Sequence, residues 1–169
     1  GFMSKTKTTV TITVNGDVYR LGVGNSAGDI SPADTLAETL RERLLLTGTK
    51  ISCDDGACGC CTVILNGKAV PSCTILTVEC DGADIQTIEG LQNPRTGELD
   101  EVQQAFVDHS AFQCGYCTPG IIMASEALLQ ENPHPDEEEI KEALAGNYCR
   151  CISHYQVLEA VKQAAERRK

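Results

Sequence analysis

The chain has 169 residues, a formal net charge of −10, ten cysteines and no tryptophan. This length suits one domain or two small ones, and lobes of about 80 residues usually need cross-links or bound metal for stability. The acidic net charge argues against a basic face of the kind that nucleic acid requires, so we expect no nucleic-acid partner. No apolar run is long enough to span a membrane, so we expect no membrane insertion.

The start of the chain shows no secretory signal, because its lysines are followed by a strand-like alternation and not by an apolar stretch. We therefore expect a cytoplasmic, bacterial protein, although export with a signal-bearing partner stays open. Thiols in the cytoplasm are kept reduced and tend to bind metal. The ten cysteines thus become candidate metal ligands.

The first half of the chain predicts a small sheet. Residues 9–14 alternate with period two, and Asn15-Gly16 separates them from a second such segment, which is the signal of a β-hairpin. Residues 61–73 contain the same Asn-Gly turn between two further short strands, and residues 74–91 read as two strands around an Asp-Gly turn. Between the hairpins, one helix is predicted from the spacing of Leu36, Leu40 and Leu44.

The second half predicts helices after a linker that begins at residue 91 and is rich in proline, glycine and polar residues. One helix is expected to have Thr118 as its N-cap and Pro119 in its first position. The next is expected to begin with a capping box between Asp136 and Glu139 and to close at Gly146. The last predicted helix runs to the C-terminus.

Three cysteines of the first half have the spacing C-x4-C-x2-C, and a fourth follows after eleven intervening residues; they are Cys53, Cys58, Cys61 and Cys73. This is the plant-type [2Fe–2S] spacing. Gly56 and Gly59 allow the positive φ angles with which a loop can curl around a cluster. Zinc sites more often use two short C-x2-C pairs, but zinc and disulfides stay open as alternatives.

Cys60 and Cys80 are predicted to be bystanders. Adjacent residues of an extended chain point to opposite sides, so Cys60 and Cys61 are not expected to bind the same iron. Since Cys61 fits the spacing, Cys60 is interpreted as a small, partly buried side chain. Cys80 is interpreted in the same way.

The second half holds another four cysteines, as C-x2-C and C-x-C pairs: Cys114, Cys117, Cys149 and Cys151. Each pair precedes a predicted helix N-terminus, where free N–H groups and the helix dipole stabilise thiolates. By spacing alone, zinc and an iron–sulfur cluster are comparable here.

The segments "CDDGACGCCTV", "QCGYCTPGIIM" and "GNYCRC", in this order, resemble the two-cluster iron–sulfur subunits of the xanthine oxidase family of molybdenum hydroxylases. The match covers nearly the whole chain and is similar to the separate small subunits of bacterial carbon monoxide dehydrogenase and 4-hydroxybenzoyl-CoA reductase. The resemblance implies an α+β protein, with an N-terminal β-grasp ferredoxin-like domain at residues 3–89 and an all-α four-helix domain at residues 90–169. It also implies one [2Fe–2S] cluster in each domain.

The same resemblance implies an electron-transfer subunit in a hetero-oligomer, whose other members would be a large molybdenum-cofactor subunit plus a medium FAD subunit. Electrons would pass from molybdopterin through both clusters to FAD or another acceptor. This oxidoreductase subunit would contain no substrate site and no catalytic residue of its own. By position, Gln113 would hydrogen-bond the pterin, and Cys151 would be both a cluster ligand and a link to the pterin.

The sequence departs from the family pattern at Cys60, where a small residue such as alanine is usual, and at "CISHY", which is one residue longer than the usual segment. His154 in that segment is interpreted as a helix-entry residue preceded by Ser153 as N-cap, while a hydrogen bond to a cofactor or partner stays open. His109 and His134 are interpreted as solvated. Two other functions stay open, a free-standing ferredoxin-type carrier and a zinc-bound interaction module.

Overall fold

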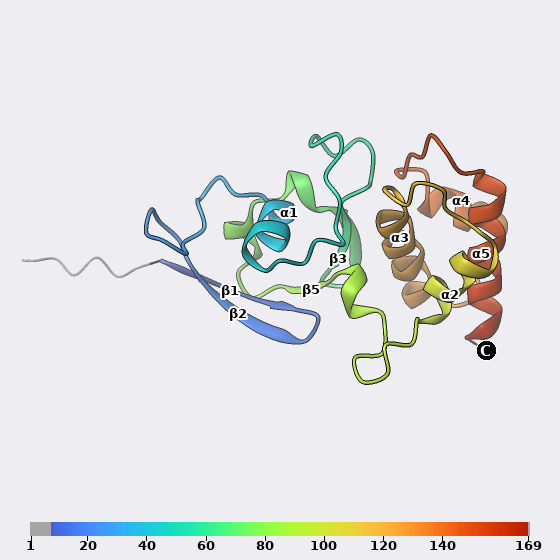
Figure 1. Ribbon diagram of the computed structural model, residues 1–169, viewed down its shortest axis with the longest axis horizontal. Helices are drawn as coiled ribbons and strands as arrows, with labels where there is room; N and C mark the ends of the chain where they lie inside the picture. Colours follow the sequence, from blue (N-terminus) through green and yellow to red (C-terminus); the bar gives the residue numbers. More distant parts are fainter. Residues whose placement is uncertain (1–7, 169) are drawn as a thin grey trace, which may run out of the picture.

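The computed structural model describes residues 8–168, so the interpretation of the first seven residues lies outside it. The described chain has an α+β fold: a five-stranded sheet and its connections form one lobe, and a group of helices forms the other (Figure 1). We call residues 8–90 the sheet lobe and residues 99–168 the helical lobe. Among the described residues, no helix is long and apolar enough to cross a membrane.

The sheet is mixed and has the strand order β2-β1-β5-β3-β4. β1 runs antiparallel to β2 and parallel to β5, and β3 runs antiparallel to both β4 and β5. Both predicted hairpins are confirmed, and all four residues of their Asn-Gly turns have the positive φ angles that type I′ turns require. The strands are β1 (Thr9–Val14), β2 (Asp17–Gly22), β3 (Thr62–Leu65), β4 (Lys68–Pro71) and β5 (Asp84–Gln86).

The predicted helix of the sheet lobe is confirmed but irregular. It begins as α1 (Leu36–Glu38) and continues as a π-helix (Thr39–Arg43). A capping box between Thr35 and Glu38 fixes its start. Two of its leucines are fully buried, and the third is partly buried and packs on the same core between helix and sheet.

One predicted strand is wrong. The first of the two strands expected within residues 74–91 is replaced by a 3-10 helix (Thr77–Cys80). The buried hydroxyl of Thr77 hydrogen-bonds the hydroxyl of Thr39 at 2.6 Å, which ties this segment to the π-helix instead of to the sheet. Cys73, expected on a strand, lies in another 3-10 helix (Ser72–Thr74) that directly follows β4.

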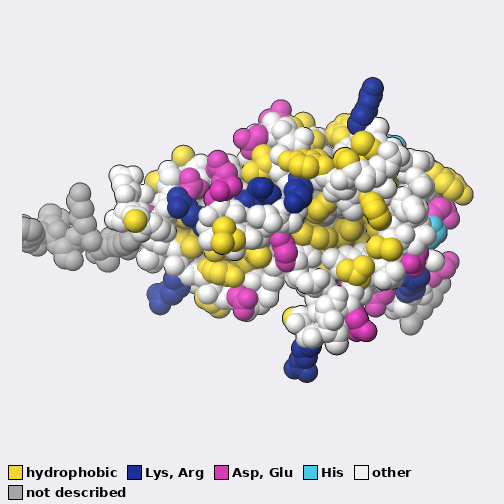
Figure 2. All heavy atoms as spheres, viewed as in Figure 1, with side chains coloured by type: hydrophobic (Ala, Val, Ile, Leu, Met, Phe, Trp, Pro, Cys, Tyr) yellow, Lys and Arg dark blue, Asp and Glu magenta, His cyan; other side chains and the backbone are white. Residues whose placement is uncertain are grey.

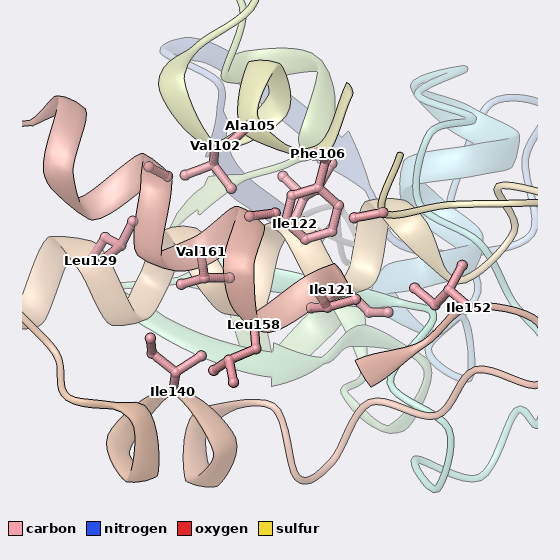
Figure 3. Packing of buried hydrophobic residues seen from close by; sticks show 14 of the residues in the cluster. Val102, Ala105, Phe106, Ile121, Ile122, Leu129, Ile140, Ile152, Leu158 and Val161 are labelled. Atoms are coloured by element: carbon pink, nitrogen blue, oxygen red, sulfur yellow. The ribbon is translucent and has the colours of Figure 1, made fainter. Parts of the chain in front are cut away.

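The helical lobe contains α2 (Glu101–Asp108), α3 (Thr118–Glu131), α4 (Glu137–Ala143) and α5 (His154–Arg167). Figure 3 shows their shared core, in which Phe106 of α2 lies beside Ile122 of α3. The core also includes Val102, Ile121, Leu129, Ile140, Leu158 and Val161.

Two helix ends differ from the predictions. Cys117, not Thr118, is the N-cap of α3, because its carbonyl already accepts the N–H of Ile121. Thr118 is the first helical residue, and its buried hydroxyl has no hydrogen-bond partner among the described residues. The capping box of α4 is confirmed, but α4 ends at Ala143, before the predicted stop.

The two lobes share a buried contact between α3 and β3. Met123 and Ala127 of α3 pack against Ile64 of β3 in a small core of their own. At the start of α3 the backbones approach closely, since a Cβ atom on Gly120 would lie 2.2 Å from the carbonyl oxygen of Gly59. The first thiol loop is therefore packed directly against the helical lobe.

Candidate metal centres

The loop that leads into β3 carries three of the predicted ligands. Positive φ angles at Asp54, Gly56 and Gly59 make it curl, as expected for the two glycines. Cys53 and Cys58 in the loop are partly buried, whereas Cys61, which directly precedes β3, is buried.

Backbone N–H groups of this loop point at its sulfur atoms. The N–H of Cys58 donates to Sγ of Cys53 at 3.3 Å, and the N–H of Cys60 donates to Sγ of Cys58 at 3.5 Å. The N–H of Cys73, from outside the loop, donates to Sγ of Cys61 at 3.5 Å. Such donors stabilise anionic thiolates, which are the form that binds metal. The structure thus brings the four predicted residues together, with Cys53 next to Cys58 and Cys61 next to Cys73.

The pKa values of these thiols differ with their surroundings. Burial alone would raise the pKa of Cys58, but hydrogen bonds from the backbone of Cys60 and from Cys53 outweigh it and lower the pKa to about 7. Burial, followed by the contact with Cys61, raises the pKa of Cys73 to about 12. Bound metal would replace the proton of such a thiol.

Cys60 and Cys61 lie on opposite sides of the chain. Cys60 is buried in the core of the helical lobe together with Cys117, whereas Cys61 packs with Cys73 in the sheet lobe. Burial and the neighbouring Cys58 raise the pKa of Cys60 to about 12. Cys80 is buried in the core of the sheet lobe. The bystander role of both residues stays a prediction, and their positions agree with it.

The second group of thiols lies where two loops of the helical lobe meet. Cys114 and Cys151 are exposed, with their sulfurs 3.9 Å apart. Sγ of Cys149 accepts the N–H groups of Cys151 and Ile152, at 3.3 and 3.4 Å. Cys117 is buried directly before α3.

In this second group, as in the first, some thiols have a lowered pKa and their neighbours have a raised one. Burial would raise the pKa of Cys149, but the N–H of Ile152 and the contact with Cys117 lower it overall. Burial, followed by the contact with Cys149, raises the pKa of Cys117 to about 12. The contact with Cys114 raises the pKa of Cys151. All four predicted residues are therefore close enough to influence one another.

The sulfurs of each group are arranged in a way that suits a two-iron cluster. All ten cysteines are free thiols. Within each group the sulfurs meet in pairs, and a [2Fe–2S] cluster takes two protein ligands on each iron.

The other singled-out side chains lie around the second group. Gln113 is exposed beside Cys114. His154 is the first residue of α5, and Ser153 caps that helix by accepting the N–H of Tyr155, which confirms the helix-entry interpretation. The interpretation of His109 as solvated is wrong, because this residue is partly buried and its Nε2 is buried with no hydrogen-bond partner among the described residues.

Sequence reasoning missed two residues that connect the thiol loops, Tyr116 and Asn147. The hydroxyl of Tyr116 donates to the carbonyl of Ile51 at 2.5 Å, and the amide of Asn147 donates to the carbonyl of Gly59 at 3.0 Å. Both residues stood in quoted motifs, but nothing in their spacing indicated a contact with a loop more than 60 residues away.

Comparison with known protein families divides the chain into two parts, each of which contains one of the two groups of thiols. Residues 25–87 match the family described as "2Fe-2S iron-sulfur cluster binding domain", and residues 87–162 match the family described as "[2Fe-2S] binding domain". The first match contains the first group of four thiols, and the second match contains the second group.

Among curated relatives, the nicotine 6-hydroxylase small subunit of Paenarthrobacter nicotinovorans is 44% identical over 80% of this chain and 80% of its own. The nicotinate dehydrogenase small FeS subunit of Eubacterium barkeri is 40% identical over 95% of this chain and 97% of its own. In quinoline 2-oxidoreductase from Pseudomonas putida 86, a matching chain superposes with a TM-score of 0.86 at 36% identity, over 96% of this chain and 97% of that one.

A longer chain contains the same fold as one part. Aldehyde oxidoreductase from Desulfovibrio gigas matches with a TM-score of 0.85 and 36% identity over 96% of this chain, but only 18% of that one. The two domain matches, the paired thiols and the similarity to small subunits over most of their length lead to one assignment. This chain belongs to the family of small iron–sulfur subunits of the xanthine oxidase-type molybdenum hydroxylases.

Proposed function

We propose that this chain is the electron-transfer subunit of a multi-subunit molybdenum hydroxylase and that it holds one [2Fe–2S] cluster in each lobe. The observation that carries the proposal is the presence of two separate groups of four thiols, each with backbone N–H groups directed at its sulfurs. The relatives are named as small subunits of a hydroxylase and of a dehydrogenase, which supports a complex over a free-standing ferredoxin.

The proposed ligands are the four thiols of each group. Cys53, Cys58, Cys61 and Cys73 would hold the cluster of a β-grasp ferredoxin-like domain, for which we propose residues 3–89. Cys114, Cys117, Cys149 and Cys151 would hold that of a four-helix domain, for which we propose residues 90–169. Bound clusters supply one-electron transfer, and the protein supplies thiolates, N–H donors and burial, which set the reduction potentials.

The exposed side of the second group is the proposed contact with the large molybdenum-cofactor subunit. Gln113, Cys114 and Cys151 are exposed there, and we propose that Gln113 and Cys151 contact the pterin. An apolar hollow of about 310 Å³ adjoins them, and Figure 2 shows hydrophobic side chains gathered over α2 and the start of α3. Its lining includes Leu99, Val107, Phe112, Pro119 and Ile122. Such a surface is suited to burial against another chain.

The acceptor side is proposed to be the exposed part of the first loop, around Asp54 and Asp55. A medium FAD subunit, or another acceptor, would approach the chain there. We place the complex in the cytoplasm, where reducing conditions keep ten thiols available for metal.

The deciding experiment measures iron and acid-labile sulfide per chain in anaerobically purified protein. About four of each are expected, because two [2Fe–2S] clusters contain that many. About two of each would mean that one thiol group holds no cluster, and the proposal would fail. Pull-down with the tagged chain is expected to recover a molybdenum-containing partner, and Gln113→Ala is expected to lower the molybdenum recovered while iron is unchanged.

A further inference from the structure

Three hydrogen bonds join the loops of the two thiol groups directly. The N–H of Tyr148 donates to the carbonyl of Cys58 at 2.9 Å, and the neighbouring amide of Asn147 donates to the carbonyl of Gly59 at 3.0 Å. The hydroxyl of Tyr116 donates to the carbonyl of Ile51. Ligand loops from two lobes are therefore held to each other by their own backbone and side chains.

Asn147 is the buried member of this set. Only 9% of its surface is exposed, and its amide also lies 3.4 Å from Oγ1 of Thr62. The hydroxyl of Thr62 itself donates to the carbonyl of Gly59 at 2.7 Å. The N–H of Thr62 also donates to this carbonyl, at 3.2 Å. The carbonyl of Gly59 thus accepts three hydrogen bonds in a buried position, and the one from Asn147 is the only one of the three that comes from the helical lobe.

The same loop is confined sterically from two sides. A Cβ atom on Gly59 would lie 2.5 Å from the carbonyl oxygen of Gly146 and 2.6 Å from Nδ2 of Asn147. On the other side, the start of α3 touches the carbonyls of Gly59 and Cys60, as shown by the contacts that a Cβ atom on Gly120 would make. The loop therefore has little room to shift once the amide of Asn147 is in place.

We propose that Asn147 is a positioning residue that fixes the first thiol group relative to the second, and so sets the electronic coupling between the two centres. The bonded route between the groups starts at Cys58, crosses the hydrogen bond from its carbonyl to the N–H of Tyr148, and reaches Cys149 through one peptide bond. Asn147 lies next to this hydrogen bond on both sides. It directly precedes Tyr148 in the chain, and its amide binds the carbonyl of Gly59, the residue that follows Cys58. The inference rests on the proposed ligand sets.

The test uses the full chain with both centres filled and reduced. Asn147→Leu keeps the approximate shape and removes the donor, and Asn147→Ala removes the donor without added bulk. Asn25→Leu, at an exposed loop position of the sheet lobe, is the matched control. The measurements are iron per chain and the magnetic interaction between the two reduced centres, read from electron paramagnetic resonance spectra. A residue that only stabilises the fold would lower the melting temperature without altering that interaction.

The expected result is full iron content with a weaker interaction in both Asn147 variants and an unchanged interaction in Asn25→Leu. If Asn147→Leu loses iron, the magnetic interaction between the centres is compared in Asn147→Ala, which adds no bulk. A wild-type interaction in iron-replete Asn147→Ala would overturn the inference while leaving the proposed function intact. A wild-type chain with only about two irons would overturn the proposed function, and the inference with it.

Discussion

Cys60 and Cys61 are neighbours that face different lobes, and this difference can be tested with single substitutions. Cys61→Ala is expected to remove the centre of the sheet lobe, because Cys61 packs with Cys73 and accepts its N–H. Cys60→Ala is expected to keep that centre, because Cys60 lies in the helical core. Iron per chain should fall from about four to about two in the first variant and stay at about four in the second.

Cys80→Ala is the control for the loss of a buried thiol, since Cys80 lies in the sheet-lobe core and not at either thiol group. If Cys60→Ala lost as much iron as Cys61→Ala, the ligand set of the sheet lobe would have to include Cys60.

The two groups of four cysteines could be recognised from their spacing alone, because ligand spacing is a local property of the chain. The position of Cys60 between the lobes depends on how those lobes pack.

A second residue-scale effect concerns Asp100, the N-cap of α2. Its side chain is only 14% exposed and lies 3.6 Å from Arg168. Burial, aided by the charge of Glu126, raises the pKa of Asp100 to about 6. The folded chain therefore binds this proton more tightly than the unfolded chain does, so stability falls as pH rises towards 6 and stays lower above it.

Asp100→Asn keeps a capping side chain and removes the charge. We expect the variant to gain stability relative to wild type as pH rises from 5 to 7, by on the order of 1 kcal/mol. Denaturant unfolding of both proteins at several pH values measures this difference. A difference that is constant across the range would show that Asp100 is ionised in the folded chain throughout.

At the scale of elements, the start of α3 has no space for a side chain at Gly120. A Cβ atom on Gly120 would lie 2.2 Å from the carbonyl oxygen of Gly59 and 2.9 Å from that of Cys60. Alanine is otherwise favoured over glycine in a helix by up to about 1 kcal/mol. Because the atoms met are backbone, we expect the clash to dominate, and Gly120→Ala should lower the free energy of unfolding by about 1 to 3 kcal/mol.

Gly146→Ala is the matched control, because a Cβ atom at Gly146 would have open space around it. Thermal unfolding of both variants distinguishes the steric effect from a general cost of replacing glycine near the thiol loops. If Gly120→Ala were as stable as Gly146→Ala, the close contact of α3 with the first loop would not persist in solution.

The elements that the sequence predicted well depend on local signals. Both Asn-Gly hairpins and the capping box of α4 require only neighbouring residues, and all are present. The 3-10 helix at Thr77–Cys80 was missed because a hydrogen bond with the distant Thr39 outweighs a strand-like pattern. The early end of α4 was missed because the segment that follows it contacts the first thiol loop, where the amide of Asn147 donates to the carbonyl of Gly59. The sequence shows no sign of this contact.

At the scale of the whole molecule, the sequence divided the chain into two lobes but contained no sign of how they join. The linker that begins at residue 91 only separated a predicted sheet from predicted helices. The structure has instead a shared core between α3 and β3, and three hydrogen bonds between the thiol loops. Such contacts join residues far apart in sequence, so no local pattern contains them. Their presence implies that the lobes unfold together.

A substitution of Met123 tests whether the two lobes unfold together. Its side chain is 1% exposed and packs with Ile64 across the lobe interface. Met123→Ala is expected to lower the free energy of unfolding by about 2 to 5 kcal/mol, the usual cost of such a cavity. Val18→Ala, at a side chain 66% exposed on β2, should cost little. Far-ultraviolet circular dichroism, which follows the helices, and visible absorbance, which follows the bound centres, should report one transition that shifts together in Met123→Ala. Two separate transitions in the wild-type chain would show that the interface does not couple the lobes, and the spacing of the thiol groups would then vary with their relative motion.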